Sequence, residues 1–103
     1  MPTPAPIATV YFASQSAEIP EQSKAEIGRI AKALKGARQI ELHAYAGGGD
    51  PIDDRKVALA RALAVRAYLV DLGVANSKID VMRNDAVSRS DGNTEHVDIL
   101  VPR

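Results

Sequence analysis

The chain has 103 residues, with 13 Lys and Arg balanced by 13 Asp and Glu, and no cysteine. This length suits one domain, which buries roughly 65% of its unfolded surface without help from a metal or a disulfide. The balanced charge argues against a nucleic-acid-binding surface, the lack of cysteine excludes disulfides and thiolate metal sites, and no apolar run approaches the roughly 18 residues of a membrane helix.

The first six residues (MPTPAP) alternate proline with small residues, which disfavours both helix and paired strand. We therefore expect residues 1–6 to be a linker or tether and residues 7–103 to form the domain. If residues 1–6 are a linker, the chain belongs to a longer protein, and a signal peptide or anchor would lie upstream.

Residues 7–12 (IATVYF) are rich in β-branched and aromatic side chains and predict the first strand. A helix should follow, opened by Pro20 and closed by Gly36. Its apolar residues recur at the i, i+3, i+4 and i+7 spacing of one helix face, and they are Ile27, Ile30, Ala31 and Leu34.

Residues 40–72 form the central unit of the sequence. Apolar and polar residues alternate over 40–45, which predicts a half-buried strand. Three glycines end this strand, and Asp50 and Pro51 then provide a side-chain acceptor and a fixed φ for the start of a helix that Gly73 stops. The helix has one apolar stripe, made of Ala58, Ala62, Val65, Leu69 and Leu72.

Two further strands are predicted at residues 78–83 (KIDVMR) and 95–101 (EHVDILV), separated by a polar loop. The resulting order, βαβαββ, predicts an α+β fold in which both helices pack on one face of a mixed four-stranded sheet. The other face should be wetter, and it should carry Glu41, His43 and Tyr45.

This order and several residues resemble the OmpA-like domains, which tether Gram-negative outer membranes and motor stators to peptidoglycan. The resemblance covers residues 8–101. The family's second strand ends in Gly-His-Thr-Asp, which corresponds to residues 43–46 (HAYA), and its closing Arg-Arg-Val-x-Ile corresponds to residues 95–99 (EHVDI). The family's helix motif Asn-x-x-Leu-Ser-x-x-Arg-Ala is matched without a gap by Asp54, Val57, Ala58, Arg61 and Ala62.

The resemblance implies a peptidoglycan site that grips the zwitterionic end of a diaminopimelate side chain. Arg61 keeps the guanidinium that meets the ligand's carboxylate, but Ala46 stands where the family has the aspartate that meets the ammonium. Losing one charge-assisted hydrogen bond, worth about 1.5–3 kcal/mol, weakens binding by roughly 10- to 150-fold. Asp50 or Asp54 could replace the missing carboxylate, and Tyr45, in place of threonine, alters a neighbouring contact.

Other interpretations of these residues are simpler. Arg61 also fits an exposed helix arginine that pairs with Asp53 or Asp54. The glycine run lacks the Gly-Lys-Ser/Thr of a phosphate loop, and the three aspartates after it lack the alternate spacing of a calcium loop. Helix capping and compensation of the helix dipole explain these aspartates, so no metal or cofactor is expected.

His43 and His96 lie on strands that could be neighbours, but two imidazoles fall short of the three or four ligands of a zinc site. No Ser/His/Asp arrangement with an elbow motif is visible, so the sequence gives no support for an enzyme.

Two functions remain. In the first, the domain tethers its parent protein to peptidoglycan by binding the diaminopimelate-containing peptide through a weakened or degenerate site. In the second, the scaffold no longer binds peptidoglycan and serves protein–protein contact through the face that carries Glu41, His43 and Tyr45. For both, the family implies the periplasm, as part of an envelope-anchored or secreted parent protein, with neither nucleic acid nor membrane insertion by this segment.

Overall fold

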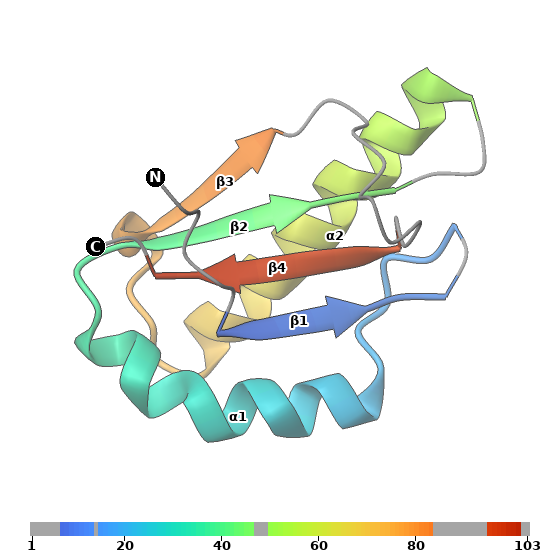
Figure 1. Ribbon diagram of the computed structural model, residues 1–103. Coiled ribbons are helices and arrows are strands. Elements are labelled where there is room, and N and C mark those ends of the chain that lie inside the picture. Colours follow the sequence, from blue (N-terminus) through green and yellow to red (C-terminus); the bar gives the residue numbers. More distant parts are fainter. Residues whose placement is uncertain (1–6, 14, 47–49, 84–94, 102–103) are drawn as a thin grey trace.

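The computed structural model describes residues 7–13, 15–46, 50–83 and 95–101 (Figure 1). Within these residues the predicted order of strands and helices is confirmed, with bounds close to those expected. The predicted linker and the polar loop after residue 83 lie outside the described residues. The elements are β1 (Ala8–Tyr11), α1 (Glu21–Gly36), β2 (Ile40–Ala44), α2 (Pro51–Asp71), the short 3₁₀ helix η1 (Asn76–Lys78), β3 (Ile79–Arg83) and β4 (His96–Leu100).

The four strands form one mixed sheet in the order β1-β4-β2-β3 (Figure 1). The last strand in the sequence, β4, lies between β1 and β2 and runs antiparallel to both, whereas β2 and β3 are parallel. The predicted mixed four-stranded sheet is therefore confirmed, and its two edges are β1 and β3.

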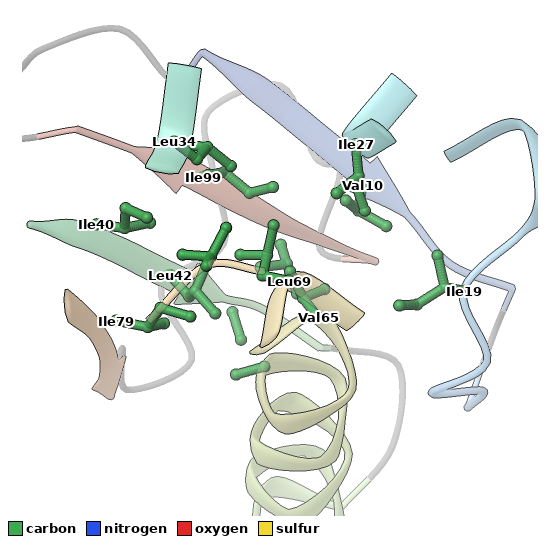
Figure 2. Packing of buried hydrophobic residues seen from close by; sticks show 14 of the residues in the cluster. Val10, Ile19, Ile27, Leu34, Ile40, Leu42, Val65, Leu69, Ile79 and Ile99 are labelled. Carbon is green, nitrogen blue, oxygen red and sulfur yellow. The ribbon is translucent and has the colours of Figure 1, made fainter. Parts of the chain in front are cut away.

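The hydrophobic core lies between one face of this sheet and the two helices (Figure 2). Residues paired across neighbouring strands point to the same face, so the pairing of β4 with β1 and β2 aligns one apolar layer. Its members include Val10, Leu42, Val97 and Ile99. The buried side chains that both helices contribute to the same cluster are Ile27 and Leu34 from α1, and Ala62, Val65 and Leu69 from α2. This arrangement confirms the predicted stripes on both helices.

The face of the sheet that the helices leave uncovered is more buried at its centre than expected. Glu41, His43 and Tyr45 are half-buried, but His96 and Asp98 of β4 are buried. The prediction of a wetter face is therefore wrong for β4, because side chains from the segments beside it cover this face of the strand.

Aromatic rings and a hydroxyl cover the polar groups of β4. The ring of His96 stacks on Tyr45 with their centres 4.5 Å apart and lies 6.1 Å from the ring of Tyr11. The carboxylate of Asp98 accepts a hydrogen bond of 2.9 Å from the hydroxyl of Thr9. Buried polar groups need hydrogen-bond partners, and Asp98 finds one on the neighbouring strand β1.

α2 also has a second apolar face, which points away from the core. Its large residues are exposed, and they are Ile52, Leu59, Leu63 and Val70. The predicted stripe of α2 therefore describes only one of its two apolar faces.

Candidate functional site

The first turn of α2 fixes the position of the candidate site. Asp50 is the N-cap, and its carboxylate accepts a hydrogen bond of 3.2 Å from the backbone N–H of Ile52. Pro51 occupies the first helical turn, as predicted. Arg61 lies two helical turns after Asp54 and therefore on the same side of the helix. Both are buried, so this side faces the protein interior.

Arg61 is fully buried, with 0% of its surface exposed, and its guanidinium binds three backbone carbonyls. Nε donates to the carbonyl of Ser16 at 2.7 Å, Nη1 to that of Tyr45 at 2.9 Å, and Nη2 to that of Ala13 at 3.0 Å. These acceptors belong to the turn after β1 and to the end of β2. Arg61 therefore joins two segments that are distant in the sequence.

A fourth bond makes the site an ion pair. Nη2 of Arg61 also donates to Oε2 of Glu95 at 2.5 Å, just before β4. The guanidinium lies 5.1 Å from the centre of the Phe12 ring, a distance typical of a cation–π contact. The interpretation of Arg61 as an exposed residue paired with Asp53 or Asp54 is therefore wrong.

Among the candidate residues, Asp54 is a buried carboxylate whose hydrogen bonds are incomplete. Only 7% of its surface is exposed, and within the described part of the chain its Oδ1 has no hydrogen-bond partner. A buried carboxylate oxygen without a donor is unfavourable, and a cationic donor would remove that penalty. Asp53, its neighbour in the same helical turn, is exposed.

The remaining candidates have smaller roles in this geometry. Asp50 is exposed and uses its carboxylate as the helix cap, whereas Asp54 is buried. Tyr45 offers Arg61 its carbonyl, while its ring stacks on His96. Ala46 is buried next to Tyr45, and the glycines that follow it lie outside the described residues.

The two histidines do not form a metal site among the residues that the structure describes. Nε2 of His43 lies 2.9 Å from Oε1 of Glu41, and Nε2 of His96 lies 3.7 Å from Oδ2 of Asp98. No group of three or more metal-ligating side chains occurs in the described ranges. In those same ranges, no helix has both the length and the apolar character needed to cross a membrane.

Three partners of Arg61 were not predicted from the sequence: Glu95 and the carbonyls of Ala13 and Ser16. Backbone carbonyls carry no signal in the residue type, so those two could not be found. A signal did exist for Glu95, because an acidic residue stands where the OmpA-like motif has arginine.

Comparison with known proteins bears on the family and the fold. The model of the OmpA family matches residues 11–98. No curated protein shows a significant match.

Three solved structures are similar to this one. The peptidoglycan-associated lipoprotein from Burkholderia pseudomallei gives a TM-score of 0.75 at 22% identity, covering 89% of this chain and 87% of that one. The OmpA-like domain of FopA1 from Francisella tularensis gives 0.74 at 24%, covering 88% and 68%. The C-terminal domain of Helicobacter pylori MotB gives 0.70 at 20%, covering 91% and 83%. At these identities the similarity shows the fold alone.

Proposed function

Because this chain belongs to the OmpA family, we propose that it binds peptidoglycan and tethers its parent protein to the cell wall in the periplasm. One structural neighbour is itself described as a peptidoglycan-associated lipoprotein. In this proposal the domain binds without catalysing a reaction, and its site is weaker than that of the family because Ala46 replaces the aspartate.

The observation that carries this proposal is Oδ1 of Asp54, which has no hydrogen-bond partner among the described residues. A diaminopimelate side chain ends in an ammonium and a carboxylate, and the buried face of α2 presents a carboxylate at Asp54 and a guanidinium at Arg61. Helical side chains lean toward the helix N-terminus, so Arg61 is directed back toward the turn that carries Asp54. We assign the ammonium to Asp54 and the carboxylate to Arg61.

Sedimentation with purified diaminopimelate-containing sacculi tests this assignment. Asp54→Asn keeps the shape of the side chain and removes its charge, so binding should fall by roughly 10- to 150-fold. Asp53→Asn is the matched control, since Asp53 is exposed in the same helical turn and its loss should leave binding unchanged. Equal binding by wild type and Asp54→Asn would remove Asp54 from the site.

A second substitution tests the place of the missing aspartate. Adding Ala46→Asp to the Asp54→Asn variant moves the carboxylate to the position that it has in the family. Binding to sacculi should then rise by at least about tenfold over Asp54→Asn alone, the lower limit for one charge-assisted bond. If the double variant folds but gains no affinity, the family's clamp geometry is not preserved at residue 46.

A second candidate function is supported by the internal bonding of Arg61. All four of its observed hydrogen bonds go to the protein itself, which suits a purely structural arginine. The domain would then act in protein–protein contact through the partly accessible face of Glu41, His43 and Tyr45. Folded wild-type protein that fails to sediment with sacculi would favour this function over the first.

A further inference from the structure

We propose that Glu95 occupies the place of a ligand carboxylate on Arg61 and thereby sets the affinity of the site. This inference rests on the proposed function for the identity of the ligand. It concerns a residue that the OmpA-like motif does not supply, because Glu95 stands where that motif has arginine.

Three of the four acceptors that bind Arg61 cannot be exchanged for a ligand. They are backbone carbonyls of Ala13, Ser16 and Tyr45. Tyr45 is held further by its backbone N–H, which donates to the carbonyl of His96 at 2.9 Å. Displacing any of these carbonyls would require a shift of the backbone at the ends of β1 or β2.

Glu95 differs from these backbone acceptors in two respects. It binds Arg61 through a side chain, which can rotate away without moving a strand, and 25% of that side chain is exposed while Arg61 has no exposed surface. Solvent therefore reaches the guanidinium's partner but not the guanidinium. A ligand would approach Arg61 from the side on which Glu95 stands.

Glu95 presents to Nη2 of Arg61 the same functional group, a carboxylate, that the end of a diaminopimelate side chain would present. Because Glu95 is part of the chain, it competes at a high effective concentration, of the order of millimolar or above. A ligand carboxylate must displace it, so removing the charge of Glu95 should strengthen binding.

The test compares wild type with Glu95→Gln and Glu95→Ala, and uses Glu26→Gln, an exposed charge on α1, as the matched control. Two probes are titrated while the Nε–H resonance of Arg61 is followed by ¹⁵N NMR. Free meso-diaminopimelate tests both ends of the site, Asp54 and Arg61. Sodium acetate tests the Arg61 end alone, with sodium chloride as the ionic control.

We expect the Kd for meso-diaminopimelate to be at least about tenfold lower in Glu95→Gln than in wild type, the lower limit for one charge-assisted bond. Acetate should shift the Arg61 resonance in both Glu95 variants at concentrations that leave wild type and Glu26→Gln unchanged. Glu95→Asp keeps the charge and gives a second measurement if a neutral variant does not fold, because it should bind meso-diaminopimelate like wild type.

The outcomes separate this inference from the proposed function. If wild type sediments with sacculi and no Glu95 variant gains affinity, or if Glu95→Asp gains as much as Glu95→Gln, the inference is overturned and the proposed function stands. If wild type does not sediment but Glu95→Gln binds meso-diaminopimelate and acetate, the inference stands and the proposed function is overturned. If no variant binds any probe, both are overturned.

Discussion

At the scale of single residues, the buried guanidinium of Arg61 joins the turn after β1, the end of β2 and the residue before β4. Its planar fork reaches acceptors in three directions, which a lysine ammonium on a flexible stem cannot reproduce in the same place. We therefore expect Arg61 to stabilise the fold whether or not a ligand uses it.

Arg61→Ala should lower the free energy of unfolding by at least about 3 kcal/mol, because it removes a fully buried donor from Glu95 and from three backbone carbonyls. Arg61→Lys should recover only part of this loss. Urea denaturation followed by circular dichroism measures both. Arg29→Ala, an exposed arginine on α1, is the control and should change the free energy of unfolding by less than about 0.5 kcal/mol. A similarly small effect of Arg61→Ala would show that the hydrogen bonds around Arg61 are not needed for stability.

Arg61 could be selected from the sequence, because its spacing from Ala46 and Asp54 matches a known motif. The burial of Arg61 and its hydrogen-bond partners could not be predicted from the sequence. The acceptors at Ala13 and Ser16 are backbone atoms whose positions depend on how the turn after β1 packs against α2. The buried Asp54 oxygen without a partner among the described residues could not be predicted either, since a charged residue in a first helical turn is ordinarily solvated.

At the scale of the elements, α2 shows what periodicity can and cannot predict. The spacing of Val65 and Leu69 correctly identified a buried stripe. The same helix carries Leu59 and Leu63 on a second, exposed side, and periodicity does not say which of two apolar sides meets the sheet.

Leu69→Ala should lower the free energy of unfolding by about 2–5 kcal/mol, because Leu69 is completely buried in the core cluster and its removal leaves a cavity. Leu63→Ala removes the same atoms from the second, exposed side of α2, where the residue is 38% exposed, and its effect should be clearly smaller. Chemical denaturation of the two variants under identical conditions makes the comparison. Equal losses would mean that the outer face of α2 is also packed in solution.

The strand β4 was predicted with nearly correct bounds but with the wrong surroundings. Its alternating pattern is typical of a strand with one wet face, whereas all five residues of His96–Leu100 are buried. The difference arises because the sequence does not show which side chains will lie beside a strand, and only the assembled sheet places Thr9, Tyr11 and Tyr45 next to the polar residues of β4.

At the scale of the whole molecule, the sheet depends on its last strand. Val10 pairs with Val97, and Leu42 pairs with Ile99, so β4 is the only described strand that connects β1 to β2. Such pairing of distant segments costs loop-closure entropy and slows folding relative to a domain built from local contacts.

A chain that ends at residue 94 should therefore fail to fold, because β1 is left without a partner and the core is open to water. Near-UV circular dichroism and the dispersion of amide resonances measure this loss. Deletion of residues 1–6 is the control, since they are predicted to be a linker, and it should leave both signals unchanged. A truncated chain with native amide dispersion would show that β1 and β2 can assemble without β4.

The antiparallel pairing of β1 and β4 has a mechanical consequence. The backbone N–H of Ile7 donates to the carbonyl of Ile99, so β1 begins where β4 ends, and the candidate site around Arg61 lies at the opposite end of the sheet (Figure 1). A ligand held at the site and a load applied through residues 7 or 101 would pull along the strands. Hydrogen bonds between strands run across that direction, so tension loads them together in shear and does not open them one after another.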